Sequence, residues 1–102
     1  MFFSMVKEST LPSEVYKALG DPTRFKIFLT LAQSRDRLCV NAIAARLKLS
    51  QPAVSQHLKI LKAAGIALSD REGHRIHYGI DRDLVRSSMQ KIISLVQKPD
   101  NA

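Results

Sequence analysis

The chain has 102 residues, of which 45% are hydrophobic, and it carries a formal net charge of +7. The length predicts one small domain spanning residues 1–102, and the hydrophobic share excludes a chain that stays disordered. The positive charge, with an isoelectric point of about 10, indicates an anionic partner, with nucleic acid first and a membrane surface second.

The cysteine content and the apolar runs narrow the class of protein further. The single cysteine, Cys39, excludes an intrachain disulfide framework and a cysteine-rich zinc site within one chain. No run approaches the roughly 18 apolar residues of a membrane span, and the start of the chain lacks the features of a signal peptide. We therefore expect a cytoplasmic protein that is not bound to a membrane, and no pattern indicates a cofactor.

Two helices are predicted in the first third of the chain. The first covers about residues 10–19 and ends near Gly20, which suits the position after a helix end. The second begins at Asp21 and Pro22, because aspartate caps free amides and proline fits the first turn. Four side chains of the second helix lie at helical spacing and are expected to face the core: Phe25, Phe28, Leu29 and Ala32.

A helix-turn-helix is predicted over about residues 41–64. A short extended piece that contains Cys39 precedes a helix for which Asn41 is a good N-cap. Ser50 is a second N-cap, and the helix that follows it ends at Gly65. Because only a very short turn separates the two helices, the second is the natural reader of a DNA groove.

The second helix of this pair has two different faces. At about 100° per residue, one arc is apolar and is expected to face the core: Ala53, Val54, Leu58, Ile60 and Leu61. The first turn and the outward arc carry polar or cationic side chains and no acid: Ser50, Gln51, Pro52, Ser55, Gln56, Lys59 and Lys62. Glutamine and serine can read base edges and lysine neutralises phosphates, so we predict that this face binds DNA. The alternative is an ordinary amphipathic surface helix, whose exposed face usually carries more acids.

His57 is the ambiguous member of this helix. The helical wheel places it at the edge of the inward arc. A histidine in that position packs against a neighbouring helix more often than it touches DNA, and both interpretations stay open.

A β-hairpin, expected to form a wing, is predicted over about residues 66–80. Apolar and polar residues alternate on both sides of a turn placed at Glu72 and Gly73. Arg71, His74 and Arg75 surround the tip, where a wing lies along the DNA backbone or in the minor groove. The alternative is a solvated turn, since charged hairpin tips are common.

The last helix is predicted over about residues 82–97 and carries a long apolar stripe: Leu84, Val85, Met89, Ile92, Ile93 and Val96. Phe2, Phe3 and Val15 add apolar surface near the start of the chain. Because a domain this small does not need all of this surface, we expect the helices at about 10–19 and 82–97 to form a homodimer. A dimer would present two reading heads to a pseudo-palindromic site. Packing within a single subunit is the alternative.

The order of elements predicts a mainly α fold, a winged helix-turn-helix of about five helices with a β-hairpin wing. Three stretches then resemble the ArsR/SmtB family of bacterial and archaeal repressors: Lys17–Leu31, Leu47–Ile66 and Arg71–Ile80. The resemblance implies a homodimer joined through the first and last helices, and binding to a double-stranded operator that an inducer relieves. The reading positions of the family fall on Gln51, Ser55, Gln56, His57 and Lys59.

The inducer sites of that family match this chain poorly. The segment that aligns with the thiol-rich arsenic- and lead-type site is Cys39–Ala44, in which Cys39 is the one thiol, whereas soft metals favour several converging thiolates. The last helix has no histidine for a zinc-type site, and His74 and His77 lie on the hairpin without an evident partner. We therefore expect no metal site, and the inducer stays unassigned. Cys39 is either a thiol sensor, alone or across the dimer, or a buried inert side chain.

The leading function is a DNA-binding transcriptional regulator that acts as a repressor. The alternatives are a redox- or thiol-responsive repressor acting through Cys39, a nonspecific architectural DNA-binding protein, and a protein-interaction module. An enzyme is not expected, because no paired acids, nucleophile–base spacing or phosphate-binding glycine loop occurs.

Overall fold

The computed structural model describes residues 11–97, in which five helices and three short strands follow one another. The elements are α1 (Ser13–Leu19), α2 (Pro22–Gln33), β1 (Leu38–Cys39), α3 (Val40–Leu47), α4 (Gln51–Ala63), β2 (Ala67–Glu72), β3 (Arg75–Ile80) and α5 (Arg82–Val96). The predicted helix-turn-helix followed by a β-hairpin and a last helix is confirmed. The two phenylalanines expected at a dimer interface, Phe2 and Phe3, lie outside the described residues.

Three helices begin at side-chain caps. The Arg24 amide donates to Asp21 Oδ2 at 2.9 Å, and Pro22 opens α2, as predicted. The Ala53 amide donates to Ser50 Oγ at 3.2 Å, which confirms Ser50 as the cap of α4. Asp81 caps α5 in the same way, through the Leu84 amide at 3.0 Å. These caps bind amides that have no partner within the helix.

Two predicted helix-end roles are wrong. Asn41 does not cap α3, because the helix begins at Val40 and its N-cap is Cys39, whose side chain makes no capping bond. Cys39 instead pairs with His77 in the sheet, so the residue directly before α3 belongs to strand β1. Gly20 was predicted to lie one position after the helix end. It is instead the C-cap residue of α1, and its backbone is right-handed, with φ −79°.

The core lies between α1, α2, α3, α4 and the start of the hairpin. Its largest fully buried side chains come from α2, α3, α4 and the residue before β2: Ile27, Ile43, Val54, Leu58, Leu61 and Ile66. Two residues predicted to face this core are wrong, since Phe25 is 42% exposed and Ile60 is 43% exposed. Ile27 and Leu58 hold the inward positions of their helices, and residues two positions away point about 200° from them.

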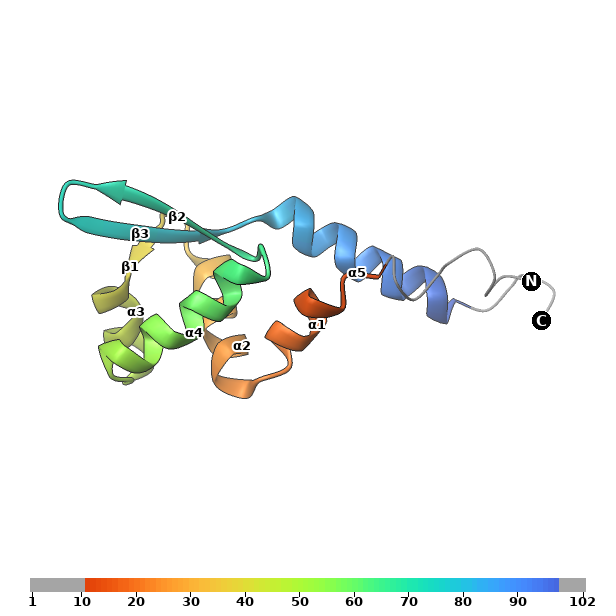
Figure 1. Cartoon of the computed structure of the whole chain (residues 1–102), viewed down its shortest axis with the longest axis horizontal. Helices are drawn as coiled ribbons and strands as arrows, with labels where there is room; N and C mark the ends of the chain where they lie inside the picture. Colours follow the sequence, from red (N-terminus) through yellow and green to blue (C-terminus); the bar gives the residue numbers. More distant parts are fainter. Residues whose placement is uncertain (1–10, 98–102) are drawn as a thin grey trace.

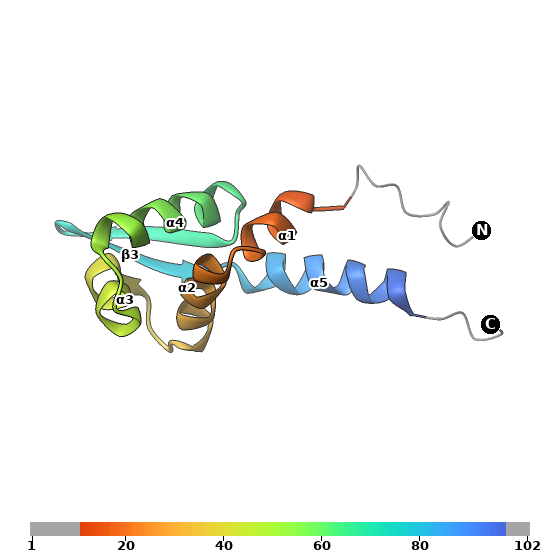
Figure 2. The ribbon, with the colours of Figure 1, turned by 90° about the horizontal axis from the view of Figure 1, so that it is seen from below.

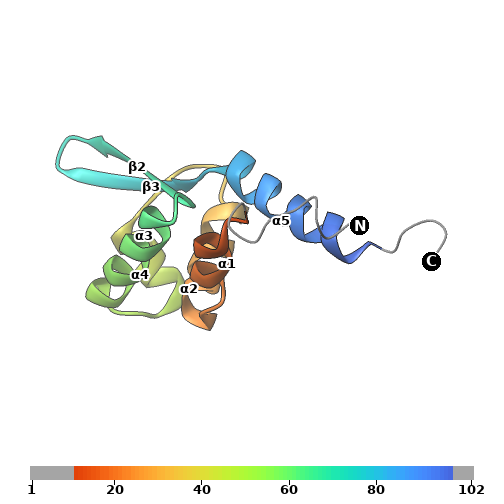
Figure 3. The same ribbon diagram turned by 45° about the vertical axis from the view of Figure 1, so that its right-hand side comes forward.

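The two strands of the hairpin and β1 form a three-stranded antiparallel sheet in the order β1-β3-β2. Glu72 pairs with Arg75 in the ladder, so the turn is Gly73-His74 and not Glu72-Gly73 as predicted. Gly73 has φ +65°, a conformation that glycine adopts without steric cost. The sheet lies along one side of α3 and α4, and its free end extends away from α5 (Figures 1 and 3).

The last helix, α5, projects from the body of the molecule at the end opposite the tip of the hairpin (Figures 1 and 2). It is joined to α1 by the Tyr16 hydroxyl, which donates to the Ser88 carbonyl at 2.6 Å. Ser88 is 2% exposed, so a small residue lies where the two helices approach. Among residues 11–97, no helix has both the length and the apolar character needed to cross a membrane.

Candidate nucleic-acid interface

The turn between α3 and α4 has a fixed geometry. Lys48 takes a left-handed conformation with φ 56° and ψ 45°, and the Leu49 amide donates to the Ala44 carbonyl at 3.0 Å. Ser50 then caps α4 directly. Because the turn is closed by a backbone bond on one side and a cap on the other, it sets the orientation of α4 relative to α3.

The outward face of α4 is exposed as the wheel predicted. Six side chains of the predicted reading set are exposed on this helix: Gln51, Pro52, Ser55, Gln56, Lys59 and Lys62. The capping residue Ser50 is exposed as well. On the opposite side, Val54, Leu58 and Leu61 are at most 1% exposed. The apolar side therefore fixes α4 to the core and leaves a polar, acid-free surface in solvent.

His57 does not belong to that surface. Its side chain is 23% exposed, and its Nδ1 atom lies 4.0 Å from Oδ2 of Asp21, at the start of α2. The hydrogen bond from the Arg24 amide, with smaller contributions from the charges of Arg24 and His57, holds the pKa of Asp21 below its ordinary value. The structure thus favours the packing interpretation of His57, between α4 and α2, over contact with DNA.

The wing brings further cations to the same end of the molecule. Arg71, His74 and Arg75 are exposed around the end of the hairpin. The tip of the hairpin and the start of α4 lie at the end of the molecule away from α5 (Figure 1). The predicted base-reading face and the predicted wing contacts therefore lie together on one end.

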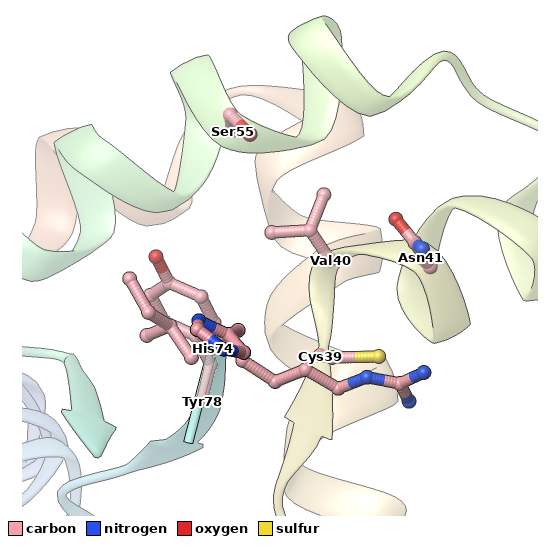
Figure 4. A pocket seen from close by; sticks show the side chains of 8 residues that line it. Cys39, Val40, Asn41, Ser55, His74 and Tyr78 are labelled. Carbon is pink, nitrogen blue, oxygen red and sulfur yellow. The ribbon is translucent and has the colours of Figure 1, made fainter. Parts of the chain in front are cut away.

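A hollow of about 330 Å³ lies between α4 and the wing. Its walls come from the start of α3, from α4 and from the hairpin (Figure 4): Cys39, Val40, Asn41, Ser55, His74, Arg75, Ile76 and Tyr78. Asn41 and Tyr78 were not among the residues predicted to bind DNA. The pairing of β1 with β3, in which Leu38 lies opposite Tyr78, brings them to this hollow. No local spacing in the sequence predicts that pairing.

Cys39 is a half-buried free thiol in the wall of this hollow. Within the described part of the chain, no group of three or more histidine, cysteine, aspartate or glutamate side chains is placed to hold a metal ion. Cys39 therefore stands among polar and cationic neighbours and not among further thiols.

In the single chain, only part of the predicted dimer surface is exposed. Ile92, Ile93 and Val96 of α5 are 37%, 44% and 73% exposed in a single chain, and Met89 is half-buried beside them. Leu84 and Val85 pack against the protomer's own core. Val15 is wrong as an interface residue, because it is 3% exposed and buried in that same core.

Comparisons with known proteins agree with this architecture. The family model described as bacterial regulatory protein, arsR family, matches residues 21–69. An HTH-type transcriptional regulator of Methanocaldococcus jannaschii is 43% identical over 86 residues, covering 84% of this chain and 91% of the relative. The transcriptional repressor SdpR of Bacillus subtilis is 35% identical over 89 residues, covering 87% of this chain and 97% of the relative.

Solved structures show the same fold. The homodimeric winged helix-turn-helix DNA-binding domain of a possible ArsR-family transcriptional regulator from Mycobacterium bovis, solved by NMR, superposes with a TM-score of 0.67. It is 32% identical, and the match covers 79% of this chain and 74% of that one. The helix-turn-helix, the wing and the last helix of this chain thus have a counterpart in a solved DNA-binding domain.

Proposed function

Because this chain belongs to the arsR family of bacterial regulatory proteins and is a DNA-binding transcriptional regulator, we propose that it acts as a homodimeric repressor that an inducer releases from its operator. In this proposal α4 enters the major groove and the hairpin lies over the adjacent minor groove. As a regulator of transcription, it is proposed to work in the cytoplasm, and no catalytic activity is proposed.

One observation carries the proposal: the exposed face of α4 has base-reading and cationic groups and no acid. Gln51 and Gln56 have amides that can bind an adenine edge in two places, and Lys59 can neutralise a phosphate. An architectural protein would need the positive charge but not the glutamines. The composition of this face therefore supports reading of a specific sequence.

The dimer in this proposal forms through the exposed apolar residues of α5. Ile92, Ile93 and Val96 lie at the end of the molecule opposite the reading face (Figure 1). A two-fold axis at that end would place the two copies of α4 at the two ends of the dimer, where both can face the same duplex. The operator would then be pseudo-palindromic, with one half-site for each subunit.

A thiol-responsive repressor is the second candidate, and the position of Cys39 favours it. The thiol shares its hollow with Ser55 of α4 and Arg75 of the wing. A group added to the sulfur would occupy space between the two DNA-binding elements, so a chemical signal at Cys39 would reach the reading face directly.

The experiment is a gel-shift titration of the full chain on the DNA upstream of its own gene and on a scrambled duplex of equal length. We expect retardation of the upstream fragment at concentrations that leave the scrambled duplex free, and an affinity that falls steeply with salt. Equal binding to both duplexes would rule out the regulatory role. The titration is repeated with oxidised protein, with thiophilic and divalent metals, and with Cys39→Ser. A response that Cys39→Ser retains places the sensor elsewhere.

A further inference from the structure

The hollow between α4 and the wing is lined by polar groups that have no partner. Asn41, Ser55 and Tyr78 come from α3, α4 and β3 and point around one space (Figure 4). Among the described residues, none of the three side chains makes a hydrogen bond to another protein group, whereas the Tyr16 hydroxyl does. Asn41 and Ser55 are exposed, so both can bind water or a ligand. The three free groups therefore have their hydrogen-bonding capacity left for a ligand.

Tyr78 is the most informative of the three. Its ring is half-buried and packs against the hydrophobic core, a role that phenylalanine would fill equally well. A tyrosine hydroxyl in a partly buried setting usually finds a hydrogen-bond partner. Here the hydroxyl is directed toward α4 and the hollow (Figure 4), and it is not among the buried atoms that lack a hydrogen-bond partner, so it is accessible to water or to a ligand that enters the hollow.

The position of the hollow identifies the ligand. When a helix lies in the major groove and a hairpin in the next minor groove, one strand of phosphates runs between them. The hollow lies between these two elements, with Ser55 on the α4 side and His74 and Arg75 on the wing side. The strand that separates the two grooves must therefore pass over it.

We propose that this hollow is a seat for one phosphodiester group of the DNA backbone, an inference that rests on the proposed function. The Asn41 amide and the Tyr78 hydroxyl donate to the phosphate oxygens, and the Arg75 guanidinium neutralises the charge. In this proposal Ser55, which was predicted to read bases, contacts the DNA backbone instead. Val40 and Ile76 present apolar surface to the sugar. At about 30 Å³ for each water, the hollow of about 330 Å³ has room for a phosphate and its hydrating waters.

The first test measures the affinity of Asn41→Ala, Tyr78→Phe and Ser55→Ala for operator and scrambled duplexes. Each variant removes a donor of one hydrogen bond, and we expect each to bind about 2- to 10-fold more weakly. The loss is the same on both duplexes, because a phosphate contact carries no sequence information. Ser87→Ala is the matched control, since Ser87 is an exposed serine on α5 off its apolar stripe, and it should bind as the parent does. Thermal unfolding of Tyr78→Phe checks that the fold is kept.

The second test locates the phosphate. A neutral methylphosphonate replaces, one at a time, each phosphate between the half-site and the neighbouring minor groove. At one position the parent loses affinity, and Tyr78→Phe and Asn41→Ala lose less affinity there than the parent does, because each variant has already lost one of the contacts to that phosphate. If every variant binds as the parent does, or if no position is coupled to them, the seat does not exist. If instead the parent fails to distinguish operator from scrambled DNA, the regulatory role is overturned, while equal losses of Asn41→Ala, Tyr78→Phe and Ser55→Ala on both duplexes still support the seat.

Discussion

At the scale of single residues, position in the fold decides the role of a side chain more than its chemical type does. Asn41 is a good capping residue by type, yet it lies inside the first turn of α3 and lines the hollow. His57 lies on the DNA-binding helix, yet it packs against the start of α2. Both outcomes depend on contacts with distant parts of the chain. Ser50 and Asp21, whose roles depend on residues three positions away, were predicted correctly.

Asp21 gives a prediction about acid stability. The hydrogen bond from the Arg24 amide keeps its pKa below the ordinary value, so the folded state holds the carboxylate ionised more strongly than the unfolded state does. Its stabilising effect is present above the unfolded pKa of about 3.9 and is lost as the pH falls through the folded pKa. We predict that Tm falls more in the parent than in Asp21→Asn between about pH 6 and about pH 3, because the amide oxygen keeps the cap without titrating. Equal falls in the two proteins would exclude a role for this carboxylate.

At the scale of elements, local signals predicted most helix starts and ends and the polar face of α4, but they placed two apolar residues on the wrong side of their helices. The C′ glycine of α4 is confirmed, because Gly65 has φ +83°. The wheel placed Ile60 and Phe25 inward, whereas both are more than 40% exposed. An apolar side chain does not show which neighbour will cover it. Which residues of α2 and α4 are buried depends on how these helices pack against α1 and the sheet.

The turn of the helix-turn-helix gives a prediction at this scale. Lys48 is the one non-glycine residue with positive φ among those described, and the left-handed conformation costs an ordinary residue about 1–2 kcal/mol. Glycine removes that strain but loses about 0.5–1 kcal/mol of chain entropy. We predict that Lys48→Gly raises the free energy of unfolding by about 0.5–1 kcal/mol, measured by urea unfolding. Lys48→Ala removes the same side chain but keeps the strain, so it should not stabilise the fold. A gain in both variants would assign the effect to the lost charge.

At the scale of the whole molecule, the two ends have different chemistry. The polar face of α4 and the charged wing lie at one end, and the exposed apolar residues of α5 project from the other (Figures 1 and 2). The sequence predicted this division, because charge and apolar spacing are local properties. It did not predict the hollow between α4 and the wing, which exists only because β1 pairs with β3, so that Leu38 lies opposite Tyr78.

The apolar end gives a prediction about assembly. Ile93 is 44% exposed on α5, and Ile93→Glu would place a charge in the proposed dimer interface. We predict that the variant sediments as a monomer at micromolar concentration and binds its operator at least about tenfold more weakly, because the two half-sites are no longer bound together. Gln90→Glu adds the same charge to an exposed polar position of α5 and should stay dimeric. If Ile93→Glu remains a dimer, α5 does not form the interface.

The glutamines of α4 are proposed to read bases, and its lysines to bind the DNA backbone. One set of titrations separates these two roles. Gln56→Ala, Lys59→Ala and the control His57→Ala are titrated on the operator and on variants of it that differ by single base pairs, over a range of salt. The account predicts that Gln56→Ala loses discrimination at one operator position, by about 1–3 kcal/mol. Lys59→Ala weakens binding to every duplex alike and lowers the salt dependence by about one unit of slope. His57→Ala changes neither base preference nor salt slope. Identical effects of Gln56→Ala and Lys59→Ala, or a loss of base preference in His57→Ala, would contradict the account.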